Sequence, residues 1–274
     1  IQTLRLEHMG RCDAGFPLKL ITRLLRCSRG TIRVLSLERV HLMVSPKDIQ
    51  DFSDALRESR LEELRWNSCG IWESTLQVCS LDDVLKAVST LSTMRALDLV
   101  AAEGGVLGDL QAESARQLFC HHSHIETLRL YGFHLYQEHI QALSSNLQHH
   151  PTLQHVYLQC SLTVPAILAL AEVVTVNRRL VSLGLFSRNQ LNPDEEMALK
   201  EIASAMACNF FLKAASFTLS HNLQAETKQA FCTMLEDSNY CLQSLQFLVQ
   251  PQRGCYGEKS VNYYNGTNHC PILS

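Results

Sequence analysis

Apolar residues recur along this chain in a six-residue frame whose first, fourth and sixth positions are hydrophobic. In the copy at 125–130 the frame is IETLRL, and every frame position in every copy is apolar. Successive copies start about thirty residues apart, an interval that predicts a protein built from repeated structural units. The copies begin at residues 1, 32, 61, 94, 125, 153, 180, 212 and 242.

Between the copies, the apolar spacing changes from alternation to intervals of three and four residues, which is the period of an amphipathic helix. Ser45-Pro46 and Asn192-Pro193 place a capping side chain before a proline at the first helical position. Each repeat is therefore expected to hold one strand and one helix. The helical spacing is seen at Ile49, Phe52 and Leu56, at Val84, Leu85 and Val88, at Ile140, Leu143 and Leu147, and at Ile167, Leu170 and Val174.

One strand and one helix bury too little apolar surface to offset the entropy lost on ordering them, so the copies must stack on one another. Strands joined by helical crossovers run parallel. We therefore expect an α/β solenoid with a parallel β-sheet on its concave face and α-helices on its convex face. Residues 1–250 supply about eight full repeats plus a ninth strand. Residues 251–274 leave the frame and are expected to form a C-terminal cap or a loosely ordered tail, in which KSVNYY could add a short strand.

The repeated LxxLxL frame, with a helix in each interval, resembles the leucine-rich repeat proteins of the ribonuclease-inhibitor-like subclass. The resemblance covers about residues 1–250. Cys69 matches the Asn or Cys that this family places three residues after the last strand leucine, and Ser161 and Ser220 are possible substitutes at the same position. The resemblance implies a horseshoe-shaped, non-enzymatic module or scaffold that binds another protein through its concave face.

Side chains next to the frame positions point away from the core, because successive side chains of a strand alternate between the two faces of a sheet. Aromatic and cationic residues of this set gather in the middle repeats, where we expect one patch across three adjacent strands. Tyr and Arg are enriched in interface hot spots. The alternative is that long side chains simply cover a solvated sheet. The candidate protein-binding residues are Arg65, Arg129, Tyr131, His155, Tyr157 and Phe186.

Composition narrows the possible functions. The 274 residues are 46% hydrophobic and 19% charged, which indicates a folded protein. The formal net charge of -3 gives no basic footprint for nucleic acid. The chain has no apolar run of membrane-spanning length, so we expect no membrane partner. Its eleven cysteines are irregularly spaced and include no CxxC pair, which favours reduced packing residues. We expect a cytoplasmic monomer or part of a longer chain, with more protein upstream of Ile1.

Histidines are the residues most easily taken for chemistry. His121, His122 and His124 have metal-ligand side chains, but they lie between an expected helix and the next strand, where polar residues are ordinary. His149 and His150 occupy the equivalent junction and are interpreted as a cation or hydrogen-bond donor at a helix C-terminus. No metal or cofactor site is predicted.

Acidic residues on neighbouring expected strands, Glu7 with Glu38 and Glu63 with Asp98, lack an adjacent nucleophile or a glycine-rich loop, so a solvated charged face is favoured over catalysis. The sequon at 265–267 matters only in a secreted protein. Two other functions stay open. One is a regulator of an enzyme, such as a GTPase-activating leucine-rich repeat protein, and the other is the ligand-sensing part of a larger receptor.

Overall fold

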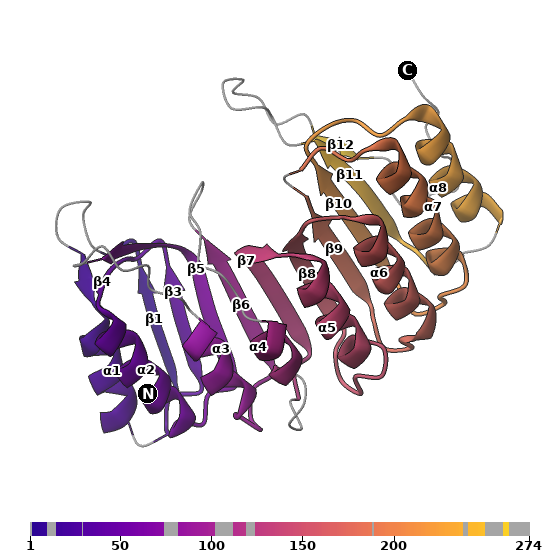
Figure 1. The fold of residues 1–274 in the computed structure, drawn as a ribbon. Coiled ribbons are helices and arrows are strands. Elements are labelled where there is room, and N and C mark those ends of the chain that lie inside the picture. The colour runs from indigo at the N-terminus through magenta and orange to yellow at the C-terminus, as the bar shows by residue number, and fades with distance from the viewer. Residues whose placement is uncertain are drawn as a thin grey trace. The chain divides into compact units, whose positions relative to one another are not determined.

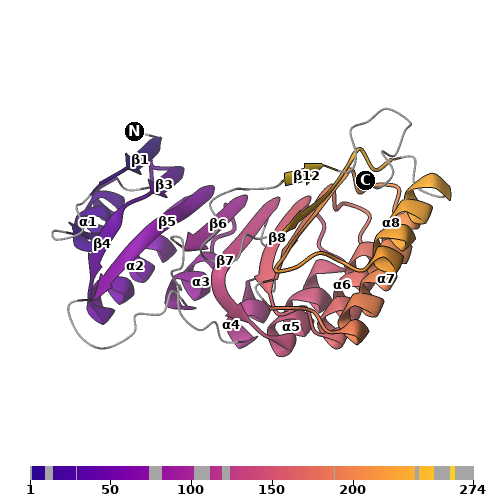
Figure 2. The same ribbon diagram turned by 90° about the horizontal axis from the view of Figure 1, so that it is seen from above.

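The computed structural model describes residues 2–9, 15–28, 30–73, 82–101, 112–118, 124–187, 189–237, 241–249 and 260–262. The chain forms two compact units, residues 1–134 and 135–274. In each unit the strands of a mainly parallel sheet alternate along the chain with helices (Figures 1 and 2). The predicted α/β architecture with parallel strands is therefore confirmed.

In the first unit, five parallel strands lie in chain order, and each of its four helices packs against the next on one face of the sheet (Figure 1). Two short strands extend the carboxyl side, where β4 pairs with β5 and β2 pairs with β4. The strands are β1 (Thr3–Glu7), β2 (Phe16–Pro17), β3 (Val34–Glu38), β4 (His41–Val44), β5 (Glu63–Glu73), β6 (Ala96–Ala101) and β7 (Thr127–Leu135). The helices are α1 (Leu18–Cys27), α2 (Pro46–Arg57), α3 (Asp82–Ser89) and α4 (Ala112–Gln117).

The second unit repeats this plan with four parallel strands and four helices. The last strand pairs antiparallel with β11 and contains part of the KSVNYY segment that was expected to add a strand. The strands are β8 (His155–Cys160), β9 (Ser182–Phe186), β10 (Ala214–Leu219), β11 (Ser244–Val249) and β12 (Ser260–Asn262). The helices are α5 (Gln137–Leu147), α6 (Val164–Val176), α7 (Pro193–Ala207) and α8 (Ala225–Asp237).

The repeated frame forms the core between sheet and helices. Strand pairing aligns equivalent frame positions, so that Leu35 lies beside Leu64 and Leu97 beside Leu128. Every frame position from residue 32 onward is buried, whereas Leu4 and Leu6 in β1 are half-buried. The sequence periodicity is thus a ladder of apolar contacts that joins each repeat to its neighbours.

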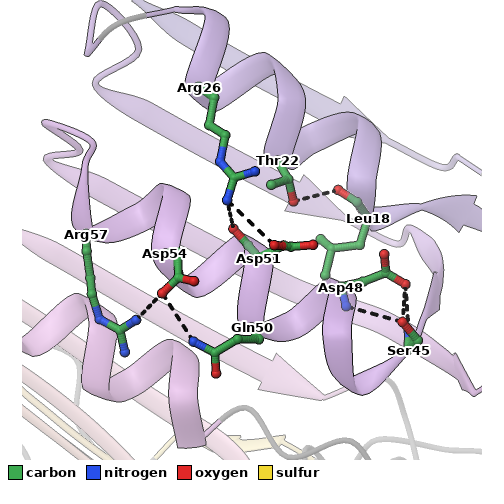
Figure 3. Close-up of polar contacts among 9 residues, drawn as sticks. All are labelled: Leu18, Thr22, Arg26, Ser45, Asp48, Gln50, Asp51, Asp54 and Arg57. Atoms are coloured by element: carbon green, nitrogen blue, oxygen red, sulfur yellow. Dashed lines mark hydrogen bonds and ion pairs between the residues drawn. The ribbon is translucent and has the colours of Figure 1, made fainter.

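Helix starts are fixed by the predicted caps. The Ser45 hydroxyl accepts a hydrogen bond from the Asp48 backbone N–H at 3.2 Å, and the Asp48 carboxylate accepts one from the Ser45 N–H at 2.9 Å (Figure 3). Asn192 and Glu195 form the same reciprocal pair at the start of α7. Both capping boxes satisfy backbone donors that the first helical turn leaves without partners. Figure 3 also shows Arg26 of α1 reaching the α2 backbone.

Two buried asparagines hold the turns that lead into β9 and β10. The Asn177 side-chain oxygen accepts from the backbone N–H groups of Arg179 and Leu180, at 2.7 and 2.9 Å, and its amide donates to the Leu147 carbonyl at 2.5 Å. Asn209 repeats this arrangement one repeat later, and its amide also donates to the Asn177 carbonyl at 3.1 Å. The two turns are therefore directly joined.

His150 takes the equivalent place before β8. Its Nδ1 accepts a hydrogen bond from the Leu153 N–H at 3.2 Å, and the residue is buried. Nδ1 of His150 therefore acts as an acceptor in this turn, a role that differs from the cation or donor expected at this helix end. The side chain plays the role that Asn177 and Asn209 play in later repeats.

Two residues that follow strands adopt left-handed backbone geometry. His8 after β1 and Arg39 after β3 both have φ of 52°. Their N–H groups donate to the carbonyls of Glu38 and Asn67 on the next strand, both at 2.9 Å. The same bend thus occurs at the same place in two successive repeats.

Candidate protein-binding face

The helices lie on one face of each sheet and leave the opposite face open in the described part of the chain (Figures 1 and 2). We call this opposite side the open face. Strand residues next to the buried frame positions project from it, as the alternation along the sequence predicts. Of the six candidate residues, Arg65, Arg129 and Tyr131 lie in the first unit, and the other three lie in the second.

Asp98 bonds to neighbouring side chains on the open face of the first unit. Strand pairing places it between Arg65 and Arg129, and its carboxylate bonds to the Arg129 guanidinium at 3.0 Å and to the Asn67 amide at 3.2 Å. Only 12% of its side chain is exposed. Burial raises the pKa of Asp98, although the two arginines and Asn67 oppose the rise. Arg129 is therefore engaged in holding a mostly buried charge.

Other charges of this face are neutralised within the unit. Glu7 on β1 is opposite Glu38 on β3 in the strand register, and Arg5 forms ion pairs with both carboxylates. Arg65 pairs with Glu63 at 2.7 Å, while half of its side chain remains exposed. Exposed ion pairs of this kind contribute only about 0–1 kcal/mol each. Arg65 can therefore exchange its partner at small energetic cost, which suits a binding contact.

A hydrogen-bonded group of three side chains marks the open face of the second unit. The Ser182 hydroxyl lies 2.7 Å from Nδ1 of His155 and 3.0 Å from the Tyr157 hydroxyl. Ser182 is buried, whereas His155 and Tyr157 are half-buried. The tyrosine ring is accommodated by Gly184, which is opposite it in the register of β8 and β9. A side chain of any size at 184 would collide with this ring.

The remaining candidates are Tyr131 and Phe186, and each projects from a strand of its own unit. Tyr131 on β7 is opposite Val100 on β6, and Phe186 on β9 is opposite Gln159 on β8 and Thr218 on β10. Both aromatic side chains are half-buried. Each unit thus presents aromatic surface on its open face. That Arg129, Tyr131, His155, Tyr157 and Phe186 form one patch across three adjacent strands stays a prediction.

Ser182 and His155 have the separation of a nucleophile and its base, which is the pairing that acyl transfer uses. Such chemistry also requires backbone or side-chain donors aimed at a developing oxyanion. The Ser182 N–H already donates to the Gln154 carbonyl at 3.0 Å, and the group lies on a regular parallel ladder. The arrangement therefore favours a hydrogen-bonded recognition surface.

Cys69, the residue that matches the family position, lies within β5 and forms a hydrogen bond to backbone. Its thiol donates to the Leu37 carbonyl at 3.4 Å, and burial raises its pKa to about 11. The two possible substitutes bond to side chains instead: Ser161 accepts from the Asn189 amide, and Ser220 contacts the His221 ring. Of these three residues, only Cys69 bonds to main chain through its side chain in the interactions described.

Metal and modification candidates fall largely outside the described residues. His121, His122 and the sequon at 265–267 lie there, while His124 is described and exposed. Within the described residues, no group of three or more His, Cys, Asp or Glu side chains could hold a metal ion. None of the described helices has both the length and the apolar content needed to cross a bilayer.

Neither a scan against protein-family models nor a search of curated proteins returned a match to this chain. Its function is therefore inferred from the residues of the open face.

Proposed function

We propose that this chain is a non-enzymatic protein-interaction module that recognises a protein partner through the open face of its sheets. The observation that carries the proposal is the combination, on an uncovered sheet face, of half-buried aromatic rings with charged and hydrogen-bonding groups. Tyr157 and Phe186 provide apolar area, and Arg65 provides an exposed cation. Large aromatic side chains and arginines carry most of the binding energy in typical interfaces.

Rigidity of these groups supports binding. Tyr157 is fixed by its contact with Gly184 and by hydrogen bonding to Ser182, and Arg129 is fixed by Asp98. Side chains that are already ordered lose less conformational entropy when a partner binds. The first unit therefore offers a preorganised contact at Arg129 and a more adaptable one at Arg65, and the second unit offers a preorganised contact at Tyr157.

The proposal includes assignment to the leucine-rich repeat proteins of the ribonuclease-inhibitor-like subclass, as a horseshoe-shaped solenoid of about eight full repeats. The buried frame ladder and the helix in each interval support this assignment. A cytoplasmic location belongs to the same proposal. It is supported by the thiols of Cys27, Cys69, Cys160 and Cys208, which are all free.

The test uses charge reversal on two faces of the same chain. Arg65→Glu changes the open face, and the matched control Arg23→Glu changes an exposed position on α1. Arg23 is exposed, whereas Arg65→Glu places a carboxylate beside Glu63 and opposite Asp98, so the melting temperature of each variant is measured and binding is compared where both are folded. With the purified chain as bait, the protein partner should be retained by wild type and by Arg23→Glu and lost with Arg65→Glu. Equal capture by the two variants would place recognition elsewhere.

Tyr157→Phe provides a second arm. It keeps the ring against Gly184 and removes only the hydroxyl that bonds to Ser182. Partner affinity should fall while the fold is retained. An unchanged affinity for both Tyr157→Phe and Arg65→Glu would contradict open-face recognition.

A further inference from the structure

A second surface of the second unit is formed by the turns that join helices to strands. Asn177 and Asn209, which hold these turns, are 2% and 1% exposed. In each turn the asparagine binds the backbone N–H groups of the second and third following residues. The side chains of the first and second following residues take no part in these bonds. Their identity is therefore not dictated by the turn.

These unconstrained positions hold very different residues in the two turns. The first turn exposes Arg178 and Arg179, and the second exposes Phe210 and Phe211, with exposed fractions of 57% and 45%. A cation just after a helix C-terminus is favourable because it opposes the partial negative charge of the helix end. The second turn gives up this benefit for two exposed rings at the end of α7. The side chains of Phe210 and Phe211 are therefore not needed to form the turn, just as those of Arg178 and Arg179 are not needed in the first turn.

Charge at this edge differs from charge at the same edge of the first unit. There, the residues after the first frame position alternate in sign and pair, with Arg33–Glu62 at 3.6 Å and Arg95–Glu126 at 3.1 Å. The equivalent residue, one position before β10, is Lys213, which is exposed, and its backbone N–H donates to the Val181 carbonyl. The equivalent positions of the second unit hold no acidic residue: they are Gln154, Val181, Lys213 and Gln243.

The two turns and the residue before β10 thus carry three cations and two rings. Arg178, Arg179 and Lys213 form no ion pair with the described residues, and no acidic residue occurs at 149–154, 177–182, 208–214 or 241–244. The hydrogen bond from Asn209 to the Asn177 carbonyl brings the arginine turn and the phenylalanine turn together. We call these five residues the basic-aromatic edge: Arg178, Arg179, Phe210, Phe211 and Lys213.

We propose that the basic-aromatic edge docks on the surface of an anionic lipid bilayer. Guanidinium and ammonium groups bind lipid phosphates and carboxylates, while exposed apolar rings enter the boundary between headgroups and acyl chains. The charge of the edge is complementary to an anionic surface. Two turns are also a small footprint compared with the 20–30 residues per side of a typical protein interface, whereas membrane docking requires only a few inserted side chains. This inference concerns a surface separate from the open face and goes beyond the proposed function. It also revises the expectation of no membrane partner, which rested only on the lack of an apolar run of membrane-spanning length.

Vesicle co-sedimentation of the whole chain tests the proposal. Vesicles of phosphatidylcholine mixed with phosphatidylserine should bind the chain, vesicles of phosphatidylcholine alone should bind it less, and added salt should weaken the binding. Phe210→Ser/Phe211→Ser and Arg178→Gln/Arg179→Gln should each reduce the partition coefficient by about tenfold or more, since each cation near an anionic surface contributes roughly a fivefold factor.

Matched controls come from the first unit. Leu20→Ser/Leu24→Ser removes an exposed apolar pair from α1, and Arg33→Gln/Arg95→Gln removes the paired arginines of the equivalent edge. Both should bind vesicles like wild type. A tryptophan at position 211, in the variant Phe211→Trp, should shift its emission to the blue only with anionic vesicles, which gives a readout that removes no apolar surface.

Three results would overturn the proposal. The first is that the chain does not bind anionic vesicles, and the second is that the edge variants and their controls lose vesicle binding equally. The third is that Phe210→Ser/Phe211→Ser leaves vesicle binding unchanged but weakens capture of a protein partner. The last result would assign the edge to a protein instead of a bilayer.

Discussion

The ring of Tyr157 lies so close to Gly184 on the neighbouring strand that a Cβ at position 184 would stand 2.3 Å from Cδ1 of the ring. This contact fixes the position of the tyrosine ring on the open face of the second unit. It depends on the absence of a side chain at one residue and the presence of a large one at its register partner.

Gly184→Ala should therefore destabilise the protein by about 1–3 kcal/mol, because the added methyl forces the tyrosine ring out of its place. Denaturant unfolding measures the change. In a Tyr157→Ala background the same substitution should have a much smaller effect, since the colliding ring is gone. Equal effects in both backgrounds would show that the glycine acts in another way.

Asn209→Ala should lower the free energy of unfolding by about 2–4 kcal/mol, because several buried backbone groups lose partners worth roughly 1–3 kcal/mol each. The affected groups include the Val174 carbonyl and the Leu212 N–H. Asn189→Ala is the matched control, since Asn189 is exposed and its amide bonds only the Ser161 hydroxyl in the interactions described. Chemical denaturation of both variants should separate them clearly, and similar small losses would contradict the role of Asn209.

Asp98 should make stability depend on pH. Burial raises its pKa in the folded protein above the ordinary 3.8, so the folded state binds a proton more tightly than the unfolded state. Between 3.8 and the raised pKa, the contribution of Asp98 to stability therefore increases as pH falls and is lost as pH rises. The difference in unfolding free energy between wild type and Asp98→Asn, measured across this window, should change with that sign. Parallel curves would show that Asp98 titrates alike in both states.

Cysteine alkylation should follow burial. Burial raises the pKa of Cys69 to about 11 and that of Cys160 to about 12, so both stay as thiols at pH values near neutrality. Cys27 and Cys208 are exposed. Among these four cysteines, mass spectrometry after brief iodoacetamide treatment of the native protein should find label only on Cys27 and Cys208, and denaturant should make all four react. Native labelling of Cys69 at the rate of Cys27 would contradict its tie to backbone.

The fold was predictable because its determinants repeat in the sequence. Leu64 and Trp66 of the frame are fully buried, and the cap at Ser45 forms with the predicted partner. The pairing of β4 with the far half of β5 was not predictable in the same way. The frame ends at Trp66, while β5 continues to residue 73, and no apolar period in the sequence marks the additional pairing.

The candidate site was chosen from large residues, and the small residues that contact them were missed. Ser182 and Gly184 gain their roles only from strand register, which brings a hydroxyl to His155 and an empty position to Tyr157. The turn asparagines did leave a signal, because the pattern Asn-x-x-Leu occurs at 177–180, 209–212 and 239–242. A search for recurrent polar residues, in addition to apolar ones, would have found it.

The left-handed bends at His8 and Arg39 have a consequence for how the repeats acquire their shape. Neither residue favours this conformation by itself, and a non-glycine residue pays about 1 kcal/mol to adopt it. In both cases the N–H bonds to a carbonyl of the following strand. In the first two repeats the bend is therefore held by the strand that follows, and a change in β3 or β5 that breaks this hydrogen bond should alter the bend in the repeat before it.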